Sequence, residues 1–439
     1  MAVHFASEKI GGGKTERTAV KKCNKKSRSN GALNDRHHLT LVEVVRHNLQ
    51  AFVIRQGMLA FQEMLKEEQE ALCGPAHAKC GSEEAQRWGT ARGRLVFGGQ
   101  RVVVERPRVR KAGKEVPLES WEQFSLDDPL CERAFEQMIV GVSTRNFERT
   151  LDELPEEMES HGTSRSAVSR HFKDKTEKQL EEWVTRSLAD EDLVAIMVDG
   201  IVVSCQTVLV ALGVTKEGEK KPLGLHLGTS ENAAVVQGLL DNLIGRGLDA
   251  MVPRLFVIDG SKALRKAIKN TFGRRALIQR CQVHKMRNVL DHLPKSKRPS
   301  IGSQLKDAYR SRSKLTARKR LQLVISHLED EHPDAAASLK EGLVETLSLK
   351  DIGLKESLER TLSTTNVLEN LNGSIRRVSR NVKNWKDGKM IQRWAAAGII
   401  EASSKFRKLR GFQDLEKLTS YLAEYAEQTP SIDDSEAAA

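Results

Sequence analysis

From about residue 190 the sequence becomes a succession of apolar segments that read as strands, with helices between them, and this order constrains the fold most. DLVAIMVDGIVV, QTVLVALGV and KPLGLHLG come first, separated by short polar breaks that suit turns. A helical segment, the short strand RLFVIDG, a second helix and the strand ALIQRCQVH follow. Three strands, a helix, a strand, a helix and a strand predict an α/β fold built on one sheet.

The rest of the 439-residue chain divides by composition. Residues 1–36 contain nine Lys or Arg against three Asp or Glu, with many Gly, Ser and Asn, which predicts a basic flexible arm. The net charge of +12 favours a polyanionic partner. We expect N-terminal helices and a basic β-hairpin in residues 37–125, a helix-turn-helix region in 126–187, the α/β domain in 188–410 with a helical insertion at about 290–360, and an acidic C-terminal tail in 411–439.

The six cysteines are scattered over the chain, which argues against a disulfide framework and favours a reducing, intracellular setting. No apolar run is long enough to cross a membrane, so we expect a cytoplasmic, nucleoid-associated protein without a membrane partner. Cys73, His77 and Cys80 lie close together in the sequence. A structural zinc site needs four ligands, so an ordinary loop is the simpler interpretation of this stretch.

Two segments before residue 190 are candidates for DNA contact. The first is RLVFGGQRVVVERPRVR, which predicts a hairpin with a turn at Gly98-Gly99 and a second strand that ends at Pro107. A basic two-stranded ribbon can lie along DNA, and a solvated charged strand fits the same pattern equally well.

The second is ESHGTSRSAVSRHFK, which predicts a helix-turn-helix. Gly162 suits the turn between two helices, and Ser164 suits the N-cap of the second helix. Val168 and Phe172 then face inward at helical spacing. A buried face with an incidental polar face is the alternative to a recognition helix. The outer face carries side chains of the kind that contact bases and phosphates: Arg165, Ser166, Ser169, Arg170 and Lys173.

Two of the predicted strands end in an Asp followed by a Gly, at Asp199 and Asp259. The carboxyl ends of strands in α/β sheets are where sites form, although Asp-Gly is also a common turn. A third acid, Glu369, lies beside the apolar stripe of a predicted helix in TTNVLENLNGSIRR. The alternative for Glu369 is a surface ion pair with Arg376 or Arg377.

Three carboxylates suit the binding of Mg²⁺, or Mn²⁺, because these ions prefer oxygen ligands. Two such ions can stabilise the attacking and leaving oxygens of a phosphoryl displacement. On a basic chain with a candidate DNA-reading helix, the natural substrate is a DNA phosphodiester.

Several motifs together resemble the Mutator-like transposases of bacterial insertion sequences. They are RWGTARGRLVFGGQRVVVERPRVR, VDG, LGLHLGTSENA, VIDGSKAL, RCQVHKMRNV and TTNVLENLNGSIRR. The resemblance implies an RNase H-like catalytic core with a helical insertion and an Asp-Asp-Glu triad of metal ligands, which falls on Asp199, Asp259 and Glu369. A Cys and a His separated by two residues are typical of this family, and Cys281 and His284 fill that pattern. No second pair of soft ligands follows nearby, so zinc is not expected there.

The resemblance implies a transposase that binds terminal inverted repeats, cuts DNA and joins the ends to target DNA as a homo-oligomer. His284 would contact a phosphate or a flanking base, Arg376 and Arg377 would contact DNA, and Cys281 fits equally well as a small buried residue. Trp394 could stack on an unpaired base, but a core aromatic on an apolar helix suits its surroundings better. The rival interpretations are a transcription regulator with a sensing domain, a stand-alone nuclease, and an inactive transposase copy.

Overall fold

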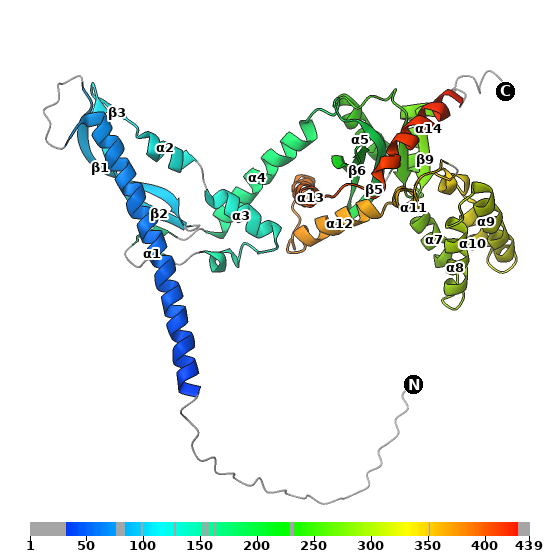
Figure 1. The fold of residues 1–439 in the computed structure, drawn as a ribbon, viewed down its shortest axis with the longest axis horizontal. Coiled ribbons are helices and arrows are strands. Elements are labelled where there is room, and N and C mark those ends of the chain that lie inside the picture. The colour runs from blue at the N-terminus through cyan, green and yellow to red at the C-terminus, as the bar shows by residue number, and fades with distance from the viewer. Residues whose placement is uncertain are drawn as a thin grey trace, which may run out of the picture.

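The computed structural model describes residues 32–75, 84–97, 100–126, 129–151, 154, 158–161, 164–228, 232–350 and 352–428. Their arrangement is elongated, with an N-terminal helix and ribbon at one end and a central sheet with its helices at the other (Figure 1). The basic arm predicted for residues 1–36 lies almost entirely outside the described residues, and so do His77, Cys80, Gly98, Gly99 and Gly162. No helix among the described residues is long and apolar enough to cross a membrane.

The N-terminal part is a long helix packed on a small antiparallel sheet. Helix α1 (Ala32–Cys73) covers the ribbon formed by β1 (Gln86–Phe97) and β2 (Gln100–Lys111), which also pairs with β3 (Lys114–Val116) and β4 (Ser160–His161). Helix α2 (Glu119–Leu126) lies beside α1 on the same face of the sheet, where Trp121 and Phe124 contact Phe61. The strand pattern arises because alternate residues of the ribbon are apolar and turn toward α1.

The hairpin is longer than expected from the sequence. Pro107 was predicted to end the second strand, but β2 continues to Lys111. Pro107 pairs with Thr90 next to a register shift in β1, and such irregular positions tolerate a residue that has no N–H group to donate.

The region expected to hold a helix-turn-helix contains α3 (Pro129–Ile139), the 3₁₀ turn η1 (Phe147–Thr150) and α4 (Arg165–Thr185). Helices α3 and α4 pack through Phe135, Met138 and Phe172. A helix was predicted on each side of Gly162. The helix before it is wrong, because Ser160–His161 form strand β4 and pair with β2. The predicted cap is confirmed, since the Ser164 side chain accepts a hydrogen bond from the Ala167 N–H.

The central sheet follows the element order expected from the sequence. It contains β5 (Leu193–Val203), β6 (Gln206–Thr215), β7 (Lys220–Gly228), β8 (Arg254–Ile258) and β9 (Ala276–Arg280), in the spatial order β7-β6-β5-β8-β9. Strands β7, β6 and β5 are antiparallel neighbours, whereas β5, β8 and β9 run parallel. Helices α5 (Ala233–Gly245) and α6 (Lys262–Phe272) provide the crossovers between the later strands.

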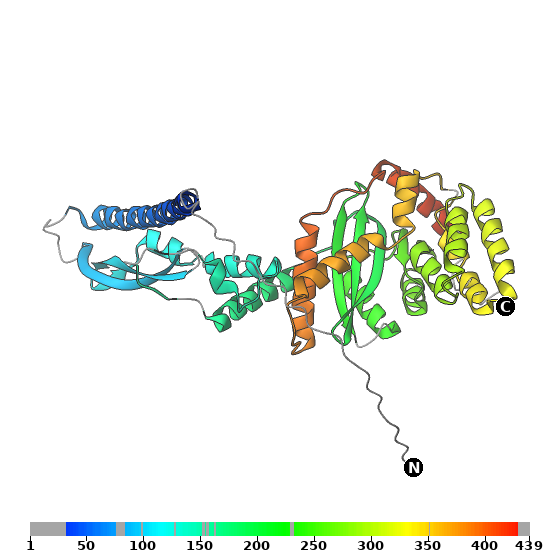
Figure 2. The same cartoon turned by 90° about the horizontal axis from the view of Figure 1, so that it is seen from below.

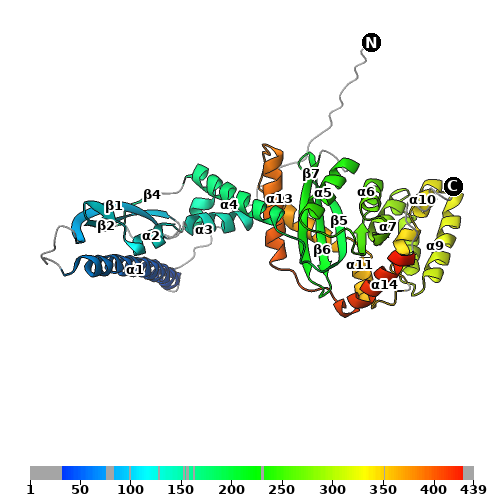
Figure 3. The same cartoon turned by 90° about the horizontal axis from the view of Figure 1, so that it is seen from above.

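Helices cover both faces of this sheet (Figures 2 and 3). Even-numbered β5 residues such as Ile196 and Val198 pack against α5 and α6. Odd-numbered ones such as Ala195 and Met197 pack against α11 (Glu356–Leu362), α12 (Asn366–Ser379), α13 (Gly388–Ser403) and α14 (Leu415–Gln428). The two faces therefore follow the alternation of side chains along each strand.

Between β9 and α11 the chain forms a helical lobe with its own hydrophobic core, in the segment expected to be an insertion. Its elements are α7 (Gln282–Asp291), α8 (Arg298–Tyr309), α9 (Lys314–Glu329), α10 (Pro333–Lys340) and the turn η3 (Val344–Leu347).

The acidic tail predicted from residue 411 does not begin there. Residues 412–414 form a 3₁₀ turn, η4 (Phe412–Asp414), and Leu415–Gln428 form α14. Leu415, Leu418 and Leu422 recur at helical spacing and are buried in the core on the α12 face of the sheet. Residues 429–439 lie outside the described residues.

Candidate active site

Asp199 and Asp259 lie beside each other on neighbouring strands. Val198 of β5 pairs with Ile258 of β8 in parallel register, so the next residue on each strand is one of the two acids. Asp259 directly follows its strand, as predicted. Asp199 does not end its strand, because β5 continues to Val203 with only β6 as its partner. The acids therefore meet where the parallel pairing of β5 and β8 stops.

Side-chain alternation explains which face of the sheet Asp199 uses. It shares the odd-numbered positions of β5 with Met197 and Ile201, which are buried against α11–α14. Its carboxylate is itself buried, with only 7% of the residue exposed, and it lies under α12. Asp259 keeps the alternation of Leu255 and Val257 on the same face. Its Oδ1 accepts a hydrogen bond of 2.8 Å from the Ser261 N–H, which fixes the turn into α6.

Helix α12 brings the third acid to this edge. The predicted apolar stripe is confirmed, because Leu368, Leu371 and Ile375 are each at most 1% exposed in the core beneath the helix. Glu369 lies beside that stripe, and its Oε1 is 3.4 Å from His284 Nε2. The alternative for Glu369 was a surface ion pair with Arg376 or Arg377. Its partner is instead His284, and both arginines are exposed about two turns further along α12.

Asn372 joins α12 directly to Asp199. It lies one turn after Glu369, is 3% exposed, and its Nδ2 donates a hydrogen bond of 3.2 Å to Asp199 Oδ2. This bond orients the carboxylate across 173 residues of sequence. The sequence alone does not single out Asn372 for this contact.

Cys281 caps the helix that carries His284. The residue before it, Arg280, pairs with Ile258, so Cys281 continues the row formed by Asp199 and Asp259 on a third strand. The thiol accepts hydrogen bonds from the N–H of His284 at 3.5 Å and from the N–H of Thr365 at 3.4 Å. Burial raises the pKa of Cys281, but the hydrogen bonds from His284 and Thr365 outweigh it and leave the pKa below its usual value.

His284 connects the cap to the acids. Its Nδ1 lies 3.2 Å from Thr365 Oγ1, and its Nε2 faces Glu369. Its hydrogen bond with Cys281, together with the negative charges of Cys281, Asp199 and Glu369, outweighs burial and raises the pKa of His284 to about 9. At neutral pH the ring is therefore a cation beside two carboxylates.

The donor set suits a hard divalent cation. Glu369 Oε1 and Asn372 Oδ1 are buried and accept no hydrogen bond from the described residues, although His284 Nε2 lies 3.4 Å from Glu369 Oε1. Carboxylate and amide oxygens are the ligands that Mg²⁺ and Mn²⁺ take. Among the described residues, however, no three His, Cys, Asp or Glu side chains are already gathered closely enough to hold a metal ion. Asp199, Asp259 and Glu369 line one edge without forming a closed cluster.

The candidate DNA contacts lie elsewhere on the surface. Arg165, Ser166, Ser169, Arg170 and Lys173 are all exposed on the first turns of α4, while Val168 and Phe172 on the same helix are buried. Lys173 also lies 4.0 Å from Glu177 one turn later.

Trp394 is a core residue, as its apolar surroundings suggested. It is 7% exposed and its ring centroid lies 4.4 Å from that of Phe172 on α4. This contact joins α13 to the candidate recognition helix, so Trp394 is not available for stacking on a base.

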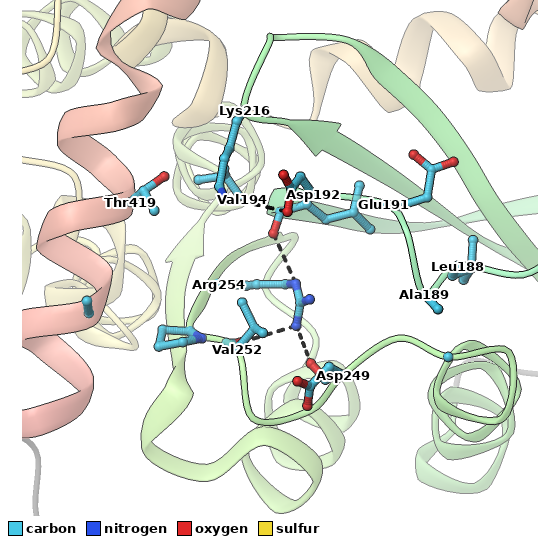
Figure 4. A pocket seen from close by; sticks show the side chains of 14 residues that line it. Leu188, Ala189, Glu191, Asp192, Val194, Lys216, Asp249, Val252, Arg254 and Thr419 are labelled. Carbon is cyan, nitrogen blue, oxygen red and sulfur yellow. Dashed lines mark hydrogen bonds and ion pairs between the residues drawn. The ribbon is translucent and has the colours of Figure 1, made fainter.

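One pocket lies at the opposite end of the parallel strands. It encloses about 250 Å³ between the starts of β5 and β8 and helix α14 (Figure 4). Its buried Arg254 donates through Nε to the Leu193 carbonyl at 3.0 Å and also binds the carbonyls of Asp249 and Val252. Because the guanidinium already binds carbonyl groups and the acids lie at the other strand ends, this pocket is structural.

Comparison with known proteins places the chain in a family. The family model described as "Transposase, Mutator family" matches residues 39–408. The transposase for insertion sequence element ISRM5 of Rhizobium meliloti (strain 1021) is 27% identical over 385 residues, which are 84% of this chain and 91% of the relative.

Two further relatives cover less of the chain. The transposase for IS256 in transposon Tn4001 of Staphylococcus aureus is 25% identical over 61% of this chain and 68% of its own length. The transposase for IS1081 of Mycobacterium tuberculosis (strain ATCC 25618 / H37Rv) is 27% identical over 64% of this chain and 67% of its own length. Since the family model spans most of the sequence, the chain belongs to the Mutator family of transposases.

Proposed function

We propose that this chain is an insertion-sequence transposase that binds the terminal inverted repeats of its element, cuts DNA strands and joins them to target DNA, acting as a homo-oligomer. The observation that carries the proposal is the parallel register of β5 and β8, which puts Asp199 and Asp259 at neighbouring positions, with Asn372 of α12, the helix that carries Glu369, bound to Asp199. Further support comes from the sheet order β7-β6-β5-β8-β9 with three antiparallel and then two parallel strands, the order expected of an RNase H-like core.

Asp199, Asp259 and Glu369 would hold Mg²⁺ or Mn²⁺, with Asn372 orienting Asp199. When bound there, two such ions would supply the positive charge that stabilises the attacking and leaving oxygens of a phosphoryl displacement. His284 would keep the Glu369 carboxylate in place through Nε2, while Thr365 holds its Nδ1, and its positive charge would attract a nearby phosphate. Helix α4 would present Arg165 and Arg170 to the inverted repeats.

The proposal is tested with purified full-length protein and a labelled duplex that contains the DNA flanking its own reading frame. Mg²⁺ should produce nicked ends, and the released 3′-hydroxyl ends should be joined to a target plasmid. EDTA should remove both products. Cutting without joining would favour a nuclease, and binding without cutting would favour a transcription regulator.

We expect the Asn372→Leu variant to cut DNA about 10–100-fold more slowly, because residues that orient metal ligands typically contribute this much. The leucine keeps the size of the side chain but removes the hydrogen bond to Asp199. The measurement is the cleavage rate against Mg²⁺ concentration. A positioning role predicts that the variant needs more Mg²⁺ for half of its own maximal rate, whereas an unchanged Mg²⁺ requirement would contradict that role.

For α4, the Arg165→Ala/Arg170→Ala double variant should bind the flanking duplex at least about tenfold more weakly, since each lost phosphate or base contact costs binding free energy. Lys405→Ala/Lys417→Ala removes the same charge from residues that already form ion pairs with Glu401 and Asp414 and serves as the matched control. Fluorescence anisotropy measures both variants. Equal affinity of the arginine variant and the control would remove α4 from the DNA interface.

A further inference from the structure

Most of the excess positive charge of the chain is concentrated on one small part of the surface. Residues 86–116, which form β1, β2 and β3, contain nine Lys or Arg and two Glu, a net charge of +7 in a chain whose total is +12. The candidate recognition helix does not include this segment. The DNA contacts proposed for α4 therefore do not explain the positive charge of the ribbon.

Helix α1 covers one face of the ribbon, and the other face is open except at Val96, which packs against the core between α3 and α4. Leu95, Val102 and Val104 are at most 5% exposed and pack against α1. Because side chains alternate along a strand, Arg94 and Arg101 point away from α1, and both are exposed. Arg94 pairs with Val103 and Arg101 with Val96, so the two arginines lie close together across the two strands.

These charges are available to a partner. Among the described residues, neither Arg94 nor Arg101 has an acidic side chain within ion-pair distance. Arg92, also exposed, lies 3.9 Å from Glu159, but 73% of the Arg92 side chain and 58% of the Glu159 side chain are exposed. An ion pair this exposed holds its partners weakly. Arg92 and Arg94 line a shallow groove with Gly93, Val103 and Glu159.

An aromatic side chain accompanies the cations. Trp88 is 48% exposed, and the guanidinium carbon of Arg110 lies 4.3 Å from the centroid of its ring. The stack holds one more arginine in a fixed orientation at the far end of the ribbon. Exposed aromatic and arginine side chains on one basic strand pair are typical of surfaces that bind nucleic acid.

We infer that the face of the β1–β2 ribbon carrying Arg92, Arg94 and Arg101 is a second DNA-binding surface, which contacts the phosphates of duplex DNA. The inference rests on the proposed function. Each strand has 12 residues, about 40 Å at roughly 3.3 Å per residue, which is close to one turn of B-DNA at about 34 Å. A two-stranded ribbon also has the width of the major groove.

Duplex DNA fits this face better than an anionic membrane. A membrane-binding surface combines cations with apolar side chains that enter the lipid. Here most apolar side chains of the ribbon turn toward α1, and the open face is mainly arginine. Arginine pairs well with phosphate oxygens because its guanidinium can donate two parallel hydrogen bonds.

The test uses the full chain and a 40-base-pair duplex of arbitrary sequence, which isolates phosphate contacts from base reading. Affinity is measured by anisotropy over a series of salt concentrations. The Arg92→Ala/Arg94→Ala/Arg101→Ala variant should bind at least about tenfold more weakly. Its slope of log K against log salt should be shallower by about 2.7, since each lost phosphate contact removes about 0.9. The corresponding triple Arg→Lys variant should keep most of the slope.

The control is Lys405→Ala/Lys408→Ala/Lys417→Ala, which removes three exposed charges outside the ribbon, on α14 and on the segment between α13 and η4, and should leave the slope unchanged. A wild-type slope in the arginine variant, with wild-type protein that still cuts its flanking DNA, overturns the ribbon surface and leaves the proposed function intact. Failure of wild-type protein to bind any duplex overturns both. Ribbon-dependent binding to anionic phosphatidylserine vesicles in place of DNA would assign the face to a membrane.

Discussion

The Asp199→Asn and Asp259→Asn variants should each lose strand cleavage by about a thousandfold or more. An amide keeps the size of the side chain but removes the negative charge that a divalent cation needs. The charge stabilisation that a bound metal supplies is worth several kcal/mol, and each 1.4 kcal/mol corresponds to a factor of ten in rate. The measurement is the rate of nicking of a labelled duplex that contains the DNA flanking the reading frame.

Both variants should remain folded and should bind that duplex like wild type, because the exposed arginines of α4 and of the ribbon lie on other elements than the strands that carry the two acids. Without metal they should be as stable as wild type or slightly more stable, since neighbouring carboxylates repel each other. Near wild-type cleavage by either variant would remove that residue from the set of metal ligands. If a variant failed to fold, the substituted residue would be needed for the structure of the protein.

The largest effect on stability is expected at the junction between the central sheet and the helical lobe. Arg280 ends β9 with a side chain only 4% exposed, and its Nε lies 2.8 Å from Glu345 Oε2 on η3. The two atoms form an ion pair, although they are not aligned as a hydrogen bond. Gly342 makes room for the guanidinium, because a Cβ there would lie 2.4 Å from Arg280 Nη1.

Arg280→Met should lower the free energy of unfolding by about 3 kcal/mol, since it removes the buried cation beside Glu345 and leaves that carboxylate with only the half-exposed Arg265 as a partner. Arg265 is the matched control. Its Nε also contacts Glu345, at 2.5 Å, but its side chain is 50% exposed. Arg265→Met should therefore cost less than about 1 kcal/mol. Urea unfolding followed by circular dichroism compares the two variants. Equal losses would show that burial of Arg280 does not matter.

Much of the central sheet could be predicted from the sequence because its strands are short, apolar and separated by helices with clear periodicity. The alternation of side chains along β5 and β8 also predicts which face of the sheet each acid occupies, which the motifs alone do not. Met197, Asp199, Leu255 and Asp259 fall on odd positions, and α12 packs on that face. Reading this alternation together with the apolar stripe of α12 would have indicated that Asn372 faces Asp199.

Other features depend on contacts that local pattern does not encode. Strand β4 consists of two residues and exists only because β2 lies beside it, so the sequence before Ser164 suggested a helix. The capping role of the Cys281 thiol depends on Thr365, which is 84 residues away. Residues 411–439 were predicted to be a tail because of their acidic composition. The leucines of α14 recur at helical spacing within that segment, and they pack on the main core.

The most direct test of the proposed active site compares the Glu369→Gln variant with wild type. Cleavage of the labelled flanking duplex and its joining to a target plasmid are measured in Mg²⁺, in Mn²⁺ and in EDTA. Glu369 is the acid furthest in sequence from the other two, and its part in the site depends on α12 lying over the sheet edge. Wild type should cut and join only with a metal ion, and Glu369→Gln should bind the duplex normally but form neither product. Metal-dependent cutting and joining by Glu369→Gln at a rate near that of wild type would contradict the proposed active site.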